Sequence, residues 1–253
     1  MTLRILSYNI LAGGEDRLSL IASVIQQQQP DLVALQEARS RSNAEALAHQ
    51  LGMSLTFGQA HNTNQDHVVW LSRLPVIHAQ NHPFPIFAKT LLEIEVLWKG
   101  VPLALFTTHL KAGQDLEGEQ RRIAEMQAIL RLLQAHQNQL QVLVGDFNTL
   151  HPTDHSNVSA YVAVLKMRGE EAPTPQFPRK VIPLLLQEGY VDCYRALHPT
   201  LPGDSSYTSH QALRVDYIFA SSRLAACLSA CDIIREGDAQ RASDHFPIWA
   251  EFR

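Results

Sequence analysis

Residues 141–149 read QVLVGDFNT, an apolar run that ends abruptly at Gly145, Asp146, Phe147 and Asn148. Short apolar runs bounded by glycine and polar residues are typical of buried strands. Glycine, aspartate and asparagine are also common turn residues, so one strand end of this kind needs only a structural explanation. The pattern recurs five more times in this chain, however, and the recurrence favours a shared functional cause.

Each of the five other runs carries a side chain that can bind a metal ion or move a proton. The runs are LRILSYN with Asn9, DLVALQE with Glu37, LALFTTH with His109, RVDYIF with Asp216, and ASDHFPIWAEF with Asp244 and His245. Active sites of layered α/β proteins gather outside strand ends. If the six ends share one rim, four carboxylates, two amides and two imidazoles converge there.

Segments with a helical spacing of apolar residues alternate with these strand-like runs. The predicted helices lie in residues 16–30, 42–52 and 118–137, and residues 179–197 are predicted to form a helix and a turn. The predicted strands lie in residues 3–10, 31–37, 67–77, 90–110, 141–148, 214–222 and 245–252. Such alternation predicts an α/β fold, which we expect to form one domain over residues 1–253. Residues 151–178 carry Pro173, Pro175 and Pro178 close together and predict an irregular surface excursion.

The composition is that of an ordinary globular protein. The 253 residues are 45% hydrophobic and 18% charged, and the net charge of −4 disfavours a sequence-independent nucleic-acid coat protein, which is usually basic. Three cysteines disfavour a disulfide framework and favour a reducing compartment. No apolar run approaches the roughly 20 residues that span a bilayer, and the first residues lack a signal-peptide pattern. We therefore expect a cytoplasmic protein without a transmembrane segment.

The converging side chains predict a divalent cation. Anions that crowd into a partly dry cleft need compensation, and an oxygen-rich set of ligands suits Mg²⁺ or Mn²⁺ better than Zn²⁺. A cation beside aspartate and histidine suits the hydrolysis of phosphoesters, because the charge on phosphate oxygens is stabilised while a base activates water. A zinc hydrolase is disfavoured because HxH and HExxH motifs are absent. Histidines outside the motifs, such as His49, His136 and His198, are expected to be surface residues.

Six motifs together resemble one known superfamily. SYNI, LVALQE, TTHL, VGDFNT, RVDYIF and ASDHFPI occur in the order typical of the endonuclease/exonuclease/phosphatase superfamily, and the resemblance spans Leu3 to Phe252. It implies a four-layer α/β sandwich, in which two mixed sheets pack face to face between helices. It also implies hydrolysis of phosphodiesters or phosphomonoesters with Mg²⁺ or Mn²⁺.

The resemblance implies a role for each motif residue. Asp146 orients or deprotonates the attacking water, Asn148 holds a phosphate oxygen, and His109 is the general acid near the leaving oxygen. His245 contacts the phosphate or acts as the base, so the choice of base between Asp146 and His245 stays open. Asp244 fixes the tautomer of His245, and the residues expected at the metal are Asn9, Glu37, Asp216 and Asp244.

Two cations are candidates for contacts with the substrate phosphate. Arg39 lies two residues after Glu37, where DNA-cleaving members of the superfamily often carry a basic residue. Lys89 opens the run KTLLEIEV, and a solvated lysine at a strand edge explains it equally well.

The favoured function is a nuclease with nucleic acid as its substrate and no obligate protein partner. GYVDCYRALHP resembles exonuclease III-type enzymes, but Tyr207–Thr208 stands without the tryptophan that usually follows threonine there, which disfavours repair of abasic sites. The alternative is a phosphatase or phosphodiesterase that acts on a lipid or small-molecule phosphate ester. A fold retained only as a binding module is disfavoured, because every expected catalytic residue is present. DNA or RNA, endo or exo cleavage, and one or two metals are all compatible with the motifs.

Overall fold

Two six-stranded β-sheets pack face to face in the computed structural model, which describes residues 2–61, 66–155, 157–167, 169, 176–199 and 206–253. We call them the first and the second sheet. The order of strands in the first sheet is β11 (Leu228–Ile233), β12 (Ile248–Phe252), β1 (Leu3–Asn9), β2 (Leu32–Gln36), β4 (Val68–Ser72) and β3 (Ser54–Gly58). The order in the second sheet is β5 (Val76–His82), β6 (Leu91–Trp98), β7 (Val101–His109), β8 (Leu140–Asp146), β10 (Asp216–Ser221) and β9 (Tyr190–Asp192).

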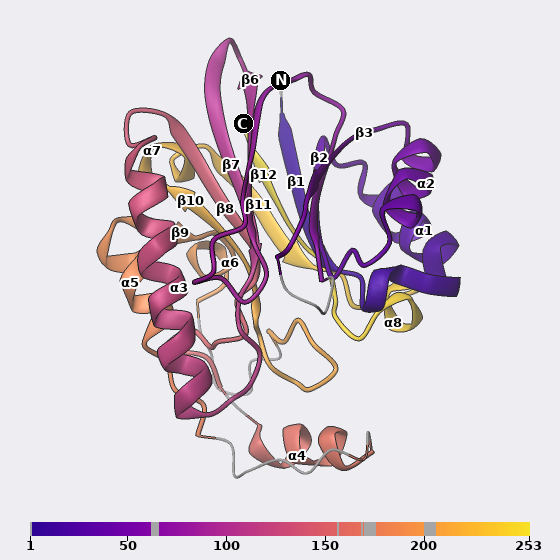
Figure 1. The fold of residues 1–253 in the computed structure, drawn as a ribbon, viewed down its shortest axis with the longest axis vertical. Coiled ribbons are helices and arrows are strands. Elements are labelled where there is room, and N and C mark those ends of the chain that lie inside the picture. Colours follow the sequence, from indigo (N-terminus) through magenta and orange to yellow (C-terminus); the bar gives the residue numbers. More distant parts are fainter. Residues whose placement is uncertain (1, 62–65, 156, 168, 170–175, 200–205) are drawn as a thin grey trace.

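Helices cover both outer faces of the pair of sheets (Figure 1), which confirms the predicted α/β sandwich. The first sheet is covered by α1 (Leu18–Gln28), α2 (Arg41–Leu51) and α8 (Ala239–Ala242), and the 3-10 helix η1 (Ala12–Arg17) precedes α1. The second sheet is covered by α3 (Leu116–Gln134) and α5 (Val181–Gln187), and the short α6 (Cys193–Leu197) and α7 (Ser222–Ala225) pack against β9 and β10. Among the described residues, no helix is both long and apolar enough to cross a bilayer.

The main core lies between the sheets, and a second core lies under α3 and α5. Alternate residues of a strand point into different cores, because successive side chains lie on opposite faces of a sheet. On β6, Leu92 and Ile94 join the core between the sheets, whereas Leu91 joins Phe106, Met126 and other residues in the core under the helices. A sheet buried on both faces explains why these strands read as nearly continuous apolar runs.

The pairing of strands brings distant motifs into one row. β8 pairs in parallel with β7, so that His109 is the register partner of Asp146, and it pairs antiparallel with β10, so that Asp216 is also a partner of Asp146. In the first sheet, β1 and β2 are parallel and end together at Asn9 and Gln36. The predicted strand ends therefore do meet on one side of the sandwich.

Several parts of the chain differ from the sequence-based expectation. Strands β3 and β11 lie in segments where no strand was predicted, and residues 179–197 contain α5, β9 and α6. Residues 67–77 form two strands, β4 and β5, which belong to different sheets. The excursion of residues 151–178 contains a helix, α4 (Val158–Met167), whose Tyr161 and Leu165 lie one turn apart and pack with Phe177 in a small separate core. The prolines before and after this helix made the segment look irregular in the sequence. Pro173 and Pro175 lie outside the described residues.

Gly145 is required where β8 passes β7. Its φ is +142°, and a Cβ added there would lie 1.9 Å from the backbone oxygen of Thr108. Because backbone cannot yield as a flexible side chain does, Gly145→Ala is expected to destabilise the fold by about 3 kcal/mol or more, which lowers the melting temperature by roughly 6 °C or more.

Urea unfolding and calorimetry measure this effect, and Gly237→Ala is the matched control. Gly237 also has a positive φ, of +62°, but nothing lies within 4 Å of the added Cβ. Equal melting temperatures for the two variants would show that the close approach of Thr108 does not constrain residue 145.

Candidate active site

Asp146, the last residue of β8, is the centre of the site. Its Oδ2 accepts a hydrogen bond from Asn9 Nδ2 at 3.0 Å, and its Oδ1 accepts one from the backbone N–H of Asn148 at 2.9 Å. Two imidazoles face Oδ2: Nε2 of His109 lies at 3.5 Å and Nε2 of His245 at 3.9 Å. Asp146 is 1% exposed, so this carboxylate is held in a largely dehydrated position.

Asn9 links Asp146 to Glu37 across the gap between the two sheets. The same Nδ2 atom lies 3.1 Å from Oε1 of Glu37, and the backbone N–H of Ala12 donates to Oε2 of Glu37 at 3.0 Å. The side-chain oxygen of Asn9 accepts from the backbone N–H of Leu11 at 3.1 Å, which fixes the orientation of the amide. The ends of β1, β2 and β8 therefore hold three side chains in contact.

Two residues of the site adopt left-handed backbone conformations. Glu37 has φ +57° and Asn148 has φ +50°, and both lie just after a strand end. Residues other than glycine rarely adopt such values, and strain of this kind concentrates at functional sites. Two hydrogen bonds stabilise the turn at Asn148. Nδ2 of Asn148 donates to the backbone oxygen of Leu110, and Nε2 of Gln114 donates to the backbone oxygen of Asn148.

The partner of His245 is Asp216, which corrects the expectation that Asp244 orients this ring. Nδ1 of His245 lies 2.8 Å from Oδ2 of Asp216. His245 forms an isolated bridge with Ser209, and Asp244 before it lies in a bend. Asp244 acts on the ring through its charge, which raises the pKa of His245, while Asp216 makes the contact with Nδ1.

The charged groups of the site shift one another's pKa values. Burial and the neighbouring carboxylate of Asp216 raise the pKa of Asp146 to about 7. Burial lowers the pKa of His245, but the carboxylates of Asp216 and Asp146 outweigh that effect and raise it to about 10. Burial, Lys89 and His245 together hold the pKa of His109 well below its ordinary value. In the metal-free protein these shifts favour an imidazolium at His245 and a neutral ring at His109.

The carboxylate oxygens of the site fit a divalent cation, whereas an imidazolium at His245 offers it no lone pair. One ligand atom each from Asp146, Asp216 and His245 lie within 4.8 Å of one another. Oδ1 of Asp216 is buried and has no hydrogen-bond partner in the described part of the chain, so one carboxylate oxygen at the centre is available. This group of three shares only Asp216 with the predicted metal set. Asn9 contacts Asp146 of this group and also contacts Glu37. The role of Asp244 at a metal stays a prediction.

The two candidate phosphate contacts differ in their surroundings. The side chain of Arg39 is 47% exposed and pairs with Asp66, its Nε 2.7 Å from Oδ1, while its backbone N–H donates to the oxygen of Glu37. Lys89 is 7% exposed, and its ammonium group makes no ion pair within the described ranges. Its charge lowers the pKa of His109, which places it beside the site.

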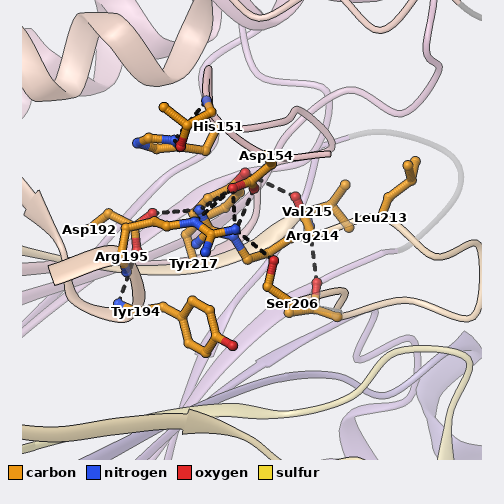
Figure 2. Close-up of polar contacts among 12 residues, drawn as sticks. His151, Asp154, Asp192, Tyr194, Arg195, Ser206, Leu213, Arg214, Val215 and Tyr217 are labelled. Carbon is orange, nitrogen blue, oxygen red and sulfur yellow. Dashed lines mark hydrogen bonds and ion pairs between the residues drawn. The ribbon is translucent and has the colours of Figure 1, made fainter. Parts of the chain in front are cut away.

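A buried ionic network supports the start of β10, and the sequence analysis did not identify it. Figure 2 shows the guanidinium groups of Arg195 and Arg214 directed at Asp154. Nε of Arg214 donates to Asp154 at 2.8 Å, its Nη2 lies 2.8 Å from Asp192, and Nη2 of Arg195 lies 2.7 Å from Asp154. Two acids and two arginines balance one another, as buried charges require.

This network lies directly before a residue of the site. Arg214 is two residues before Asp216, and its backbone oxygen accepts from the hydroxyl of Tyr217, which also donates to Thr149. Thr208 Oγ1 accepts from the backbone N–H groups of Val215 and Asp216, both at 3.0 Å. Asp192 and Arg195 lie in the GYVDCYRALHP stretch that resembles exonuclease III-type enzymes, but that resemblance does not identify which residues pair.

Several solved structures share the fold of this chain over nearly its whole length. The chain is 22% identical to the Neisseria 3' phosphatase NExo bound to a product DNA hairpin (TM-score 0.75, 99% of each chain covered). It is 21% identical to an AP endonuclease from Archaeoglobus fulgidus (TM-score 0.72, 99% of each chain) and 22% identical to the catalytic domain of human Nocturnin (TM-score 0.68, 100% of this chain and 93% of that one). These identities show a common fold.

The sequence itself matches a family over nearly its whole length. The Endonuclease/Exonuclease/phosphatase family matches residues 6–245, which include every residue placed around Asp146 above. No curated protein matches this chain. The chain belongs to the Endonuclease/Exonuclease/phosphatase family, whose members are phosphoester hydrolases.

Proposed function

We propose that this protein is a Mg²⁺- or Mn²⁺-dependent phosphodiesterase that acts on nucleic acid. The observation that carries the proposal is the position of Asp146, which contacts Asn9 and Asn148 and faces the Asp216–His245 pair from the same side. Structural neighbours named for work on DNA, among them the AP endonuclease and a D. rerio TDP2 complexed with single-strand DNA product, support nucleic acid as the substrate class.

Asp146 is the base in this proposal, and His245 contacts the phosphate. A carboxylate with a raised pKa accepts a proton from water near neutral pH, whereas an imidazolium has no free lone pair with which to do so. His245 instead offers Nε2–H to a phosphate oxygen, because Asp216 holds the other ring nitrogen. A bound Mg²⁺ or Mn²⁺ supplies positive charge that stabilises the phosphate oxygens as negative charge develops. Glu37, Asp216 and Asp244, with Asn9 beside them, are the proposed residues around that ion.

The remaining residues bind and orient the substrate. Asn148 donates through its amide, and the ammonium group of Lys89 attracts a phosphate oxygen next to His109. Because burial keeps His109 neutral, we propose that this ring donates a hydrogen bond through Nε2 and does not serve as the general acid expected from the sequence. Arg39 contacts a more distant phosphate, since Asp66 already holds its guanidinium group.

A phosphatase or small-molecule phosphodiesterase is the second candidate. It is favoured by the neighbour named as a 3' phosphatase and by the net charge of −4, which does not support tight binding of a long duplex. We also propose that the chain forms one domain and works in the cytoplasm, which the three free cysteines support.

Removal of the cation is expected to abolish activity. Purified protein treated with EDTA should lose hydrolysis of plasmid DNA, single strands, RNA and bis-p-nitrophenyl phosphate, and Mg²⁺ or Mn²⁺ should restore it. The expected loss is at least about 10³-fold, because uncompensated carboxylates then face the phosphate. Full activity in chelator would refute the metal dependence. Restored activity only on inositol phosphates or sphingomyelin would favour the second candidate.

A further inference from the structure

Three histidine rings converge on one buried carboxylate in the second sheet, outside the set of residues around Asp146. Nε2 of His82 lies 2.9 Å from Oε2 of Glu93, and Nε2 of His136 lies 3.0 Å from Oε1. Nε2 of His78 lies 3.8 Å from the same Oε1 atom. We call these four residues the Glu93 cluster. Glu93 itself is 3% exposed, so its charge is almost fully withdrawn from water.

The strand pairing explains how the cluster forms. Gln80 on the edge strand β5 is the register partner of Glu93 on β6, and His78 and His82 lie two residues to either side of Gln80 on the same face. His136 follows the C-terminal end of α3, and its ring packs edge-on against Phe106, the register partner of Glu93 on β7. Two strands and the end of a helix therefore contribute to one cluster.

Both ring nitrogens of His136 lie against oxygen atoms. Its Nδ1 lies 3.1 Å from Oε1 of Gln139, while its Nε2 faces Glu93, so both ring nitrogens meet oxygen acceptors. A flip of the Gln139 amide would remove the hydrogen bond that its Nε2 donates to Glu95 at 3.1 Å. A neutral imidazole has one N–H, and if Nδ1 carries it, the lone pair of Nε2 points at a carboxylate oxygen. That contact is favourable only with a proton or a metal ion between the two atoms.

We propose that the Glu93 cluster is a zinc site that ties the edge strand β5 to the end of α3. Imidazole nitrogens and one carboxylate are a ligand set that suits Zn²⁺ and disfavours Mg²⁺, which prefers oxygen. The hydrogen bond from His136 to Gln139 is the outer contact that orients metal-bound histidines in proteins. None of the four residues belongs to the active site, so the proposal is independent of the proposed function.

Binding requires the rings of the cluster to move closer together, because in the described part of the chain only Asp146, Asp216 and His245 bring three ligand atoms within 4.8 Å of one another. Zn²⁺ takes nitrogen and oxygen ligands at about 2.0–2.2 Å, so the three rings draw in around an ion that replaces the present direct contacts with Glu93. The side chain of His78 is 50% exposed on an edge strand, and that of His136 is 20% exposed, so these two rings have space to rotate. His82 and Glu93 are almost fully buried and form the fixed half of the site.

Equilibrium dialysis of the metal-stripped full-length chain against Zn²⁺, followed by metal analysis, tests the proposal. The His245→Ala variant is the starting protein, because it weakens adventitious binding of zinc at the active site. We expect one zinc per chain. Glu93→Gln added to this background should weaken zinc binding by at least about 10²-fold, and Glu45→Gln, at an exposed glutamate on α2, is the matched control.

Variants at the exposed rings guard against loss of the fold. His136→Asn and His78→Asn should each weaken zinc binding by about 10-fold or more, while His49→Asn on α2 should leave it unchanged. Co²⁺ bound at the cluster should give strong visible d–d absorption of a tetrahedral ion, which Glu93→Gln should remove. Zinc binding that survives Glu93→Gln and His136→Asn, or that disappears with His245→Ala alone, would overturn the proposal, as would the absence of bound zinc.

Discussion

Replacement of Asp146 by asparagine is expected to lower kcat by at least about 10²-fold, because the amide cannot accept a proton from water. The hydrogen bond from Asn148 N–H to Oδ1 is retained by an amide oxygen, so the turn at Asn148 should survive. KM should change much less than kcat, since the lost contact acts on the attacking water. Steady-state kinetics on a defined oligonucleotide in Mg²⁺ measure both constants.

The pH dependence provides a second test of the same residue. A base works only when ionised, so kcat/KM should rise with pH in the acid range as Asp146 loses its proton. The pKa of this carboxyl without metal is about 7, and a nearby cation favours the ionised form, so the midpoint should lie at or below about 7. The Asp146→Asn variant should lack this rise. An unchanged pH profile and a rate near that of the wild type would remove Asp146 from the chemistry.

The convergence of the site could be predicted because it depends on local rules. A strand that ends in polar residues can be recognised from a single stretch of sequence. Pairing with parallel and antiparallel neighbours in a sandwich then brings such ends together. The register partners His109, Asp146 and Asp216 are the result. The motif order then identified the family, and the match over residues 6–245 confirms it.

The pairing of side chains across long distances in the sequence could not be predicted. Adjacent residues such as Asp244 and His245 suggest a local pair, but the contact with Nδ1 of His245 comes from Asp216 at the start of β10. The pair of Arg214 and Asp154 is separated by 60 residues and carries no pattern in either segment. His136 likewise looks like a surface residue in sequence, and only the fold brings it to Glu93. These contacts depend on how segments far apart in the chain are placed in space, and one segment read alone does not reveal its partners.

His245→Ala is expected to lower kcat by at least about 10²-fold, because the variant loses the imidazolium that faces Asp146 and the substrate phosphate. Asp216 acts on the phosphate partly through His245, so Asp216→Asn should lower kcat substantially in the wild-type background and much less in the His245→Ala background. Asp244→Asn should couple more weakly with His245→Ala than Asp216→Asn does, since Asp244 acts on the ring through its charge whereas Asp216 contacts Nδ1. Single-turnover rates for the two double-mutant cycles measure the couplings, and Asp238→Asn, at a partly exposed acid before α8, is the control. Strong coupling between Asp244 and His245, with none between Asp216 and His245, would mean that the working enzyme pairs the ring as the sequence alone suggested.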